Sequence, residues 1–558
     1  MSILRTLLIL PAFYRLIKAE FGIAAQLFQL SRAASVNNAK LSWATVDGAT
    51  QYLVQQSLGN GGFQTIATVT GETYDSYGLT VGSTYNWRVT ASNGNAQVDQ
   101  SSTASLTPFA PQNQYNTYDN TQQTSLRIKS NLLSNGVYYR YNYETFSNGS
   151  FSRFVEQTSS DGYTFSGDKT VLTGEVLCRP SNYDCKLERV SFQPHPSLNQ
   201  FVMWAHYERS GDYGLGYVAV AHGTPGQNLQ FDGAYRPLGD DSRDMTFFVD
   251  GENAYLVTST NTNTNNNIYT LTANWTAIDQ RLVQVNVNGR REAPAVIKSN
   301  NWFYLFTSRA AGWLPSQPQY IAATSMAGPW SNPVNVGNTA TWSAQSGGVP
   351  QLESGQYAML ADQWASNWPT RGGPNRELML PVSLAPGGGF ASYHFYRTVQ
   401  YSDDISTQGQ GLYGVQPGQI LSVGKPSSSN AGTQDIALAN DGVQDTPDRF
   451  FKPSTVPFWY QIDLQDSHII SQVDLTTNLV QGSETFYRFN VTGSNDGNTW
   501  TPLADQSNNV NPGFAASLPT STERFRYVRI NVNQIRNNVN NNEADFASGV
   551  TEVTVYGT

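Results

Sequence analysis

The sequence predicts an all-β protein made of several modules, and three observations support this fold class. Aromatic residues make up 12% of the 558 residues, and 47 glycines accompany many Asn, Ser and Thr residues, a composition typical of strands and turns. Short alternating apolar segments recur between Gly, Asn and Asp turns. A chain of this length forms about three or four domains. These features exclude a helical bundle, a collagen-like chain and a disordered chain.

Charged residues are scarce, and their balance is acidic. They make up 13% of the chain with a formal net charge of -9, whereas a typical soluble protein has about 25%. Because the sequence has no basic block, we expect neither a nucleic-acid partner nor binding to an anionic membrane. It has no run of about 20 apolar residues, so we expect no membrane span. The pattern gives no sign of an obligate oligomer, and we expect a monomer.

The N-terminal segment and the cysteines favour a secreted protein. Residues 1–35 hold a short apolar run followed by charged residues. We interpret them as a targeting or unstructured segment; a poor signal peptide, an amphipathic targeting helix and a misassigned start all remain open. Cys178 and Cys185 lie in a loop-like stretch and form either one local disulfide, in an oxidising compartment, or two free thiols. Three glycosylation sequons fit secretion: Asn148, Asn274 and Asn490.

Residues 36–110 predict a β-sandwich. Alternating strands are separated by turns at a spacing of about 8–12 residues, which is typical of such folds. The segment resembles a fibronectin type III module, and the resemblance implies a spacer without chemistry of its own. It rests on these residues: Leu41, Trp43, Gly48, Ala49, Tyr52, Val54, Leu79, Gly82, Tyr85, Trp87 and Val89.

Residues 112–398 predict a five-bladed β-propeller. Pairs of strand-like segments recur at roughly 50-residue spacing, and five such clusters can each form one antiparallel blade. Strands from several blades meet at a central depression, which suits a polar pocket. Residues 399–423 are rich in Gln, Gly and Ser and are expected to form a linker.

Residues 424–558 predict another all-β unit and resemble a discoidin (coagulation factor V/VIII type C) module. The resemblance implies a jelly-roll of the kind common among carbohydrate-binding modules, with a structural Ca²⁺ site at Asp441, Thr446 and Glu552. Oxygen ligands of this kind suit a hard cation, although ordinary turn capping by Asp and Thr is the alternative. The motifs are Trp459 with Ile462-Asp463-Leu464, Gly493-Ser494-Asn495-Asp496-Gly497 with Trp500, and Tyr527-Val528-Arg529.

Three acidic residues are the best candidates for chemistry. The five histidines lack metal-ligand spacing, and no nucleophile elbow, phosphate loop or dinucleotide fingerprint is present. Glu188, Asp244 and Glu292 each border a strand-forming run and are separated by 56 and 48 residues. An ionised carboxylate is costly to bury unless it is paired with a cation or takes part in function. Acids beside strands that are expected to be buried therefore indicate either an ion pair or a functional site. A spacing of about one blade places them around the same central depression.

Residues from about 170 to 385 resemble glycoside hydrolase family 43, and within it the exo-β-1,3-galactanase branch. The resemblance implies an inverting hydrolase of β-1,3-galactan, as on arabinogalactan side chains, with a polysaccharide substrate and no catalytic cofactor. The motifs are Leu187-Glu188-Arg189, the segment 201–206, Arg236-Pro237-Leu238-Gly239, Ser242-Arg243-Asp244-Met245, Arg291-Glu292-Ala293-Pro294-Ala295, Gly312-Trp313 with Pro315 and Gln317, Ala327-Gly328-Pro329-Trp330, and Ser343-Ala344-Gln345-Ser346.

The resemblance also assigns roles. Glu292 matches the general acid, Asp244 the residue that orients this acid and tunes its pKa, and Glu188 an acid that contacts the sugar in the first subsite. Gln345 matches the residue that replaces the usual Asp base, either as an imidic tautomer or as a positioner of water. The pocket wall matches Tyr213, Trp313, Asp362 and Trp364.

Blade one departs from the galactanase pattern. Residues 138–143 read YYRYNY, with Glu144 one position late, and Ala311 stands where Thr is usual. Two alternatives follow from these departures. One is an inactive propeller that binds carbohydrate; the other is a family 43 hydrolase of another polysaccharide, such as a galactofuranoside, an arabinan or a xylan.

Overall fold

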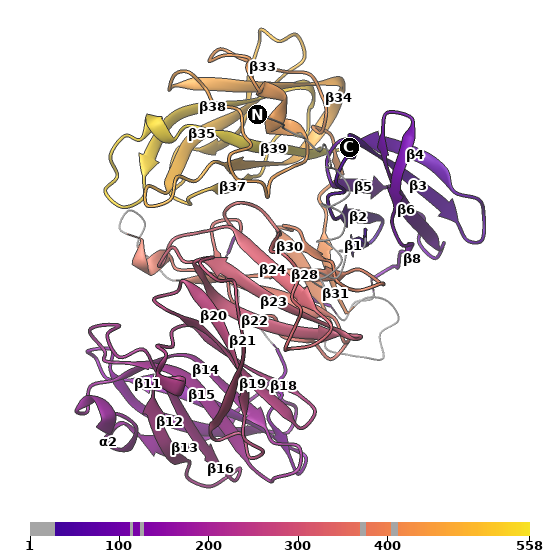
Figure 1. Cartoon of the computed structure of the whole chain (residues 1–558). Helices are drawn as coiled ribbons and strands as arrows, with labels where there is room; N and C mark the ends of the chain where they lie inside the picture. The colour runs from indigo at the N-terminus through magenta and orange to yellow at the C-terminus, as the bar shows by residue number, and fades with distance from the viewer. Residues whose placement is uncertain (1–27, 112–114, 123–127, 369–374, 403–410) are drawn as a thin grey trace, which may run out of the picture.

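The computed structural model describes residues 28–111, 115–122, 128–368, 375–402 and 411–558. Strands dominate throughout, which confirms the all-β class (Figure 1). Six short helical turns accompany the strands in these ranges: α2 (Gly174–Leu177), η1 (Arg179–Ser181), η2 (Pro237–Gly239), η3 (Ala365–Asn367), η4 (Ile436–Asn440) and η5 (Asp545–Ala547). Over the described ranges, no helix is long and apolar enough to cross a membrane.

The N-terminal unit, which we call the N-terminal sandwich, consists of two sheets packed around Trp43 and Trp87. One sheet has the order β1-β2-β5, and the other β4-β3-β6-β7 with β8 on β6. Their bounds are β1 (Leu30–Ala34), β2 (Asn38–Trp43), β3 (Gln51–Leu58), β4 (Gln64–Val69), β5 (Thr73–Tyr77), β6 (Tyr85–Asn93), β7 (Ala96–Gln100) and β8 (Ala104–Leu106).

Strand β1 corrects the predicted boundary of the first module. It lies inside the segment 1–35 that we expected to be targeting or unstructured, yet it pairs with β2 along its whole length. Leu30 is fully buried in the core of the sandwich. Burial of apolar side chains therefore extends the sandwich toward the N-terminus. The rest of that predicted segment, residues 1–27, lies outside the described residues.

The central domain contains five consecutive four-stranded antiparallel sheets within residues 128–393 as described. Within each sheet the strands follow chain order. The sheets are β10 (Leu133–Ser134), β11 (Val137–Thr145), β12 (Phe151–Ser159), β13 (Ser166–Thr173); β14 (Lys186–Pro194), β15 (Phe201–Glu208), β16 (Tyr217–Gly223), β17 (Gln230–Tyr235); β18 (Met245–Asp250), β19 (Asn253–Thr260), β20 (Asn265–Leu271), β21 (Ile278–Val285); β22 (Arg291–Ser299), β23 (Trp302–Arg309), β24 (Pro318–Ala323), β25 (Val334–Asn335); and β26 (Gln345–Ser346), β27 (Tyr357–Gln363), β28 (Arg376–Leu384), β29 (Ala391–Tyr393).

The first strands of neighbouring sheets lie against one another, β14 beside β18 and β18 beside β22. Residues that begin these three sheets are thus brought together although they are far apart in sequence. Cys178 and Cys185 form a disulfide that joins α2 to the start of β14.

The predicted linker 399–423 is partly a sheet. Strand β30 (Thr398–Tyr401) pairs with β31 (Leu412–Val415) and with β9 (Asn116–Asp119). Val399, Tyr401 and Leu412 are buried together with Tyr118. These apolar residues explain why the segment pairs instead of forming an open connector.

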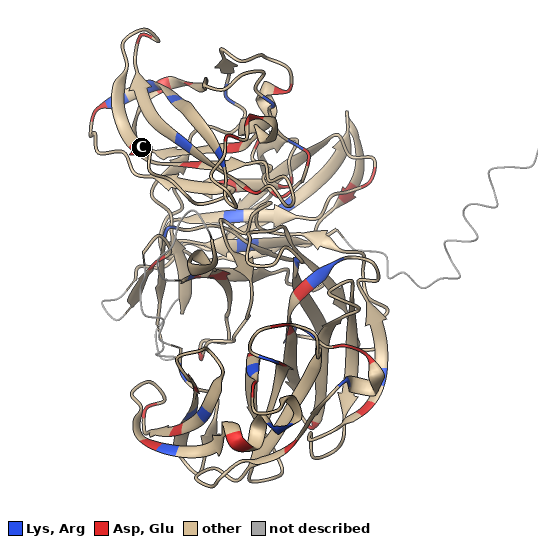
Figure 2. Ribbon diagram, turned by 90° about the vertical axis from the view of Figure 1, so that its left-hand side faces the viewer, with Lys and Arg blue, Asp and Glu red and all other residues tan. Residues whose placement is uncertain are grey.

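The C-terminal unit, which we call the C-terminal module, has the strand order β32-β39-β34-β38-β35-β36, with β33 and β37 on β34. Figure 1 shows this module and the N-terminal sandwich together at the end of the central domain formed by its last sheets. Figure 2 shows acidic and basic residues interspersed over all three parts. The bounds are β32 (Gln419–Ile420), β33 (Ser427–Ser429), β34 (Phe458–Thr477), β35 (Thr485–Ser494), β36 (Thr501–Gln506), β37 (Phe514–Ser517), β38 (Arg524–Asn537) and β39 (Val550–Gly557).

Candidate active site

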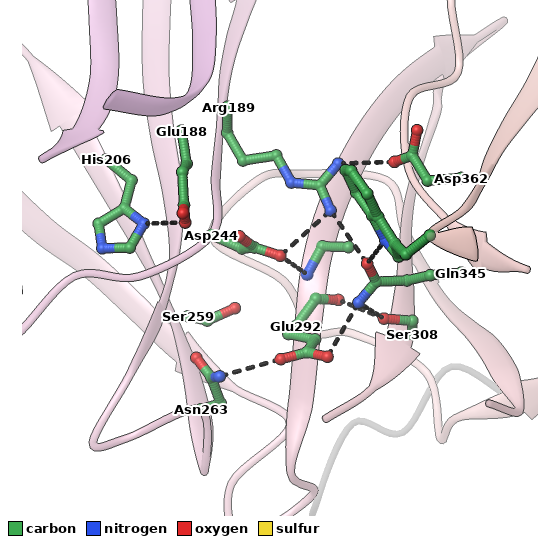
Figure 3. A network of polar contacts seen from close by, with 12 residues as sticks. Glu188, Arg189, His206, Asp244, Ser259, Asn263, Glu292, Ser308, Gln345 and Asp362 are labelled. Atoms are coloured by element: carbon green, nitrogen blue, oxygen red, sulfur yellow. Dashed lines mark hydrogen bonds and ion pairs between the residues drawn. The ribbon is translucent and has the colours of Figure 1, made fainter. Parts of the chain in front are cut away.

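The predicted acids converge at the first strands of the central sheets (Figure 3). Glu188 lies in β14 and Glu292 in β22, and Asp244 directly precedes β18. The pairing register of β14 and of β22 is interrupted just after the glutamate. In each case the next residue is left-handed, Arg189 with φ 51° and Ala293 with φ 49°. Such irregularities re-aim side chains and are typical of functional sites.

Glu292 is a buried carboxyl group that accepts hydrogen bonds from three donors. It is 6% exposed and accepts from Asn263 Nδ2 at 2.9 Å, from the Ala311 amide at 3.2 Å and from Gln345 Nε2 at 2.9 Å. Burial, reinforced by the charge of Asp244, raises the pKa of Glu292 to about 8. The side chain therefore holds a proton at neutral pH, as a general acid must.

Arg189 links three of the predicted residues. It donates to Asp244 at 3.3 Å, to Asp362 at 3.4 Å and to Gln345 Oε1 at 3.3 Å. Burial would lower the pKa of Arg189, but the surrounding carboxylates, Asp244 first, raise it above its ordinary value. Asp244 also accepts from the Ala293 amide at 3.1 Å, next to Glu292. Sequence reasoning missed Arg189, because an arginine beside an acid normally indicates a solvated surface pair.

Glu188 sits at the other side of the site among basic partners. Tyr213 donates to it at 2.7 Å, and Lys186 and His206 lie 3.3 Å from its two carboxylate oxygens. Burial alone would raise the pKa of Glu188, but the hydrogen bond and charge of His206 outweigh it with help from Tyr213, and the pKa falls to about 2. Glu188 is thus ionised at neutral pH, where Glu292 is protonated. His206 was not predicted either, since its partners become neighbours only in the fold.

Gln345 has every polar group of its amide engaged. Besides Glu292, its nitrogen donates to Ser308 Oγ at 3.1 Å, and its oxygen accepts from Trp364 Nε1 at 3.0 Å. An inverting acid and base stand about 6.5–9.5 Å apart so that sugar and water fit between them. The 2.9 Å contact leaves no such room. In this conformation Gln345 donates a hydrogen bond to Glu292 and does not meet the spacing expected of an inverting base.

The predicted pocket wall lies beside these groups. Trp313 is 41% exposed and packs edge-on against Trp364, with ring centroids 5.3 Å apart. Tyr213 is held by Glu188 and by Lys186, whose ammonium lies 3.5 Å from the ring centroid. Asp362 faces Arg189. The structure therefore brings all eight predicted site residues of the central domain into one cluster.

Glu188, His206 and Asp244 place potential metal-ligand atoms within 4.8 Å of one another, and no other such group occurs among the described residues. Each of the three has a protein partner already: Lys186 for Glu188, Glu208 for His206, and Arg189 for Asp244. These contacts join the three side chains into a network of charged groups.

The residues predicted to bind Ca²⁺ lie in β39 of the C-terminal module and in the loop that follows η4. Glu552 is buried and accepts from the Gly442 amide at 3.1 Å, while its Oε1 is buried without a hydrogen-bond partner in the described part of the chain. Asp441 pairs with Arg449, and Thr446 donates to Asp445 at 3.3 Å. Burial and the neighbouring Asp441 raise the pKa of Glu552.

Comparisons with known proteins bear on the fold. Residues 438–530 match the model of the F5/8 type C family described as NedA-like, galactose-binding domain, so the C-terminal module is an F5/8 type C-like domain. An exo-beta-1,3-galactanase from Phanerochaete chrysosporium, solved with beta-1,3-galactotriose, is 21% identical with a TM-score of 0.50 over 79% of this chain and 100% of its own. One from Clostridium thermocellum is 21% identical with a TM-score of 0.48 over 79% and 97%. No curated protein sequence matches.

Proposed function

We propose that the chain is an inverting glycoside hydrolase of family 43 that releases galactose from β-1,3-galactan, as on arabinogalactan side chains. The observation that carries the proposal is Glu292, a buried carboxyl group whose pKa is raised to about 8 by burial and by the charge of Asp244, in a cluster with the exposed ring of Trp313. In this proposal the five central sheets are the blades of a five-bladed propeller. The likeness in fold to the Phanerochaete exo-beta-1,3-galactanase supports both the hydrolase and the propeller in this proposal.

Glu292 would serve as the general acid. Its proton passes to the glycosidic oxygen as the bond from that oxygen to the sugar's anomeric carbon breaks, and water adds to this carbon from the opposite face. Asp244 would tune the acid, because its negative charge disfavours ionisation of Glu292. Arg189 would hold Asp244 in place.

Gln345 would orient Glu292 in the resting site. A neutral amide is a poor base, and its two contacts through nitrogen and two through oxygen fix which way the amide faces. Once a sugar separates it from Glu292, the same side chain would position the attacking water, and the nitrogen of its imidic tautomer would accept the proton that the water loses as the new bond forms.

Glu188 and the tryptophans would bind the sugar. An ionised carboxylate accepts hydrogen bonds from sugar hydroxyls, and Trp313 offers an exposed apolar ring to a pyranose face. Tyr213, Asp362 and Trp364 would complete the wall around the first subsite.

The remaining assignments concern the other modules. The N-terminal sandwich would be a fibronectin type III spacer and the C-terminal module a carbohydrate-binding domain, in a secreted monomer. A Ca²⁺ ion held by Asp441, Thr446 and Glu552 would stabilise the C-terminal module. The buried, unpartnered oxygen of Glu552 supports such a ligand set, and carboxylate and hydroxyl oxygens are what Ca²⁺ prefers.

A binding protein without activity is the second candidate, and packing in the first sheet favours it. Tyr141 stacks on Phe192 with ring centroids 4.3 Å apart, and its hydroxyl donates to Glu156 at 2.9 Å. Tyr141 is thus engaged in packing, which leaves fewer aromatic rings of this sheet to contact a sugar.

The test compares the full chain with its Glu292→Gln variant on β-1,3-galactan, β-1,4-galactan, arabinan and xylan. Released sugars are followed by chromatography. Galactose from β-1,3-galactan alone, absent with the variant, supports the proposal. Release from another polymer keeps the hydrolase and overturns the substrate. No release from any polymer, with binding still measurable by calorimetry, overturns the enzyme in favour of the binding protein.

A further inference from the structure

The chain takes an unusual path just before Gln345. Thr341, Trp342 and Ser343 all have left-handed backbones, with φ of 45°, 51° and 67°. Residues with a side chain rarely adopt this conformation, and three in succession persist only where the surroundings hold them. Residues 338–346, which we call the Gln345 turn, are almost completely buried.

The C-terminal module supplies much of what surrounds the Gln345 turn. The hydroxyl of Ser343, itself 1% exposed, lies 2.6 Å from the carbonyl oxygen of Pro512 and 3.2 Å from that of Phe514. At the other end of the turn, the amide of Thr339 donates to the carbonyl of Gln444 at 2.9 Å. These contacts join residues more than a hundred positions apart in sequence.

Packing at this contact leaves no space. A side chain on Gly513 would place its Cβ 2.5 Å from the Cβ of Ala340, and the φ of Gly513 is 78°. Phe514 packs edge-on against Phe395, with centroids 4.7 Å apart. The loop that carries Gly513 is therefore fitted closely to the Gln345 turn.

We propose that the C-terminal module is part of the active-site scaffold, with Ser343 as a positioning residue that holds Gln345 against Glu292. The inference rests on the proposed function and adds to it a task for the module other than binding sugar. Ser343 stands two residues before Gln345, which donates to Glu292 at 2.9 Å. We call the contacts of Ser343 with Pro512 and Phe514 the clamp. When these contacts are lost, the turn relaxes toward ordinary backbone angles and the amide of Gln345 moves away from Glu292.

The kinetic test is a double-mutant cycle on the full chain with β-1,3-galactan. Ser343→Ala is expected to lower kcat at least tenfold and to leave KM within twofold, because a Gln345 that is no longer held in place cannot position the attacking water in the transition state. In a Gln345→Ala background the same substitution should cost less than twofold, since its effect passes through Gln345. A further tenfold loss in the double variant would overturn the proposal.

Ser31→Ala is the matched control. Ser31 is also buried and also bonds across a module boundary, to Ser392 at 2.7 Å, but it lies far along the chain from the candidate site. Its kcat should stay within twofold of wild type. A loss equal to that of Ser343→Ala would show that any loosened module contact slows turnover, and this would contradict the proposal.

A measurement without substrate separates the inference from the proposed function. Amide hydrogen exchange in residues 338–346 should quicken at least tenfold in Ser343→Ala and in Gly513→Ala, which opens the contact from the module's side, but not in Ser31→Ala. Unchanged exchange in both variants overturns the clamp. Wild-type protein that releases no sugar overturns the proposed hydrolase alone, while the exchange result still decides the clamp.

Discussion

The two flanking modules contact the central domain in different places. The N-terminal sandwich reaches the outer strands of the last sheet, through Ser31 to Ser392 and through Ser42 to His394 at 2.9 Å. The C-terminal module instead reaches the turn that begins this sheet, next to Gln345. Because the first strands of the central sheets carry the polar cluster, the contact of the C-terminal module lies next to the candidate site, whereas the contacts of the N-terminal sandwich lie on the outer strands.

The two modules also meet each other around Lys40. Its ammonium is buried with Asp75 of the N-terminal sandwich and Asp474 of the C-terminal module, whose charges oppose the lowering of the Lys40 pKa by burial. Tyr556 contributes a hydroxyl 3.4 Å from Lys40. The junction is thus a cluster of buried charged groups, remote in sequence from every candidate catalytic group, and it concerns assembly of the modules.

Substitution of the acid should have the largest effect and locate the chemistry at the inner edge. Glu292→Gln is expected to lower kcat by about 10²–10⁴-fold, because the amide has no proton to give. Folding with a neutral Glu292 becomes less favourable as pH rises from about 4.5 toward 8. The variant avoids this loss, so its melting temperature at pH 7 should equal or exceed that of wild type. Turnover within tenfold of wild type would remove Glu292 from its role.

The pH profile should report the charge beside the acid. Wild-type kcat/KM is expected to fall above about pH 8, where Glu292 loses its proton. In Asp244→Asn the neighbouring negative charge is gone, the charged form of Glu292 becomes easier to make, and its pKa falls. The alkaline limb should therefore move to lower pH, with kcat reduced about tenfold or more. An alkaline limb at the same pH as in wild type, or at a higher pH, would show that Asp244 does not raise the pKa of Glu292.

The exposed ring of Trp313 should affect binding more than chemistry. Trp313→Ala is expected to raise KM several-fold with kcat nearly unchanged, because the ring stacks on the sugar in ground and transition state alike. Trp313→Phe keeps an aromatic face and serves as the control, with a smaller rise. Steady-state kinetics on β-1,3-galactan measure both. A fall in kcat without a change in KM would assign Trp313 to the acid's surroundings instead.

The Lys40 junction should affect stability and leave turnover alone. Lys40→Met removes the buried cation whose charge favours the ionised forms of Asp75 and Asp474, so ionising these acids in the folded protein becomes more costly. We expect a lower melting temperature at pH 7, a smaller loss at pH 5, and kcat within twofold at a temperature where both proteins are folded. Calorimetric scans at the two pH values check this. A large fall in kcat would remove the distinction between the two module contacts.

Sequence patterns predicted those features of the fold and of the candidate site that depend on the local order of residues. Strand alternation and turn spacing predicted all-β modules, and the spacing of Glu188, Asp244 and Glu292 placed them in one cluster. Arg189 and His206 escaped notice because nothing local distinguishes a buried, shared cation from a solvated one. The Gln345 turn escaped for a similar reason. Its support comes from residues near 512, and a contact across that separation leaves no mark on local pattern.

The most direct test of the account follows the anomer of the first product. The full chain is mixed with β-1,3-galactan in the spectrometer, and proton NMR records the released sugar before it equilibrates. The account predicts that α-galactose appears first and then converts to the β form, because water enters opposite the bond that Glu292 opens. If β-galactose appears first, the linkage is hydrolysed with retention, and an inverting site built on Glu292 and Gln345 is contradicted.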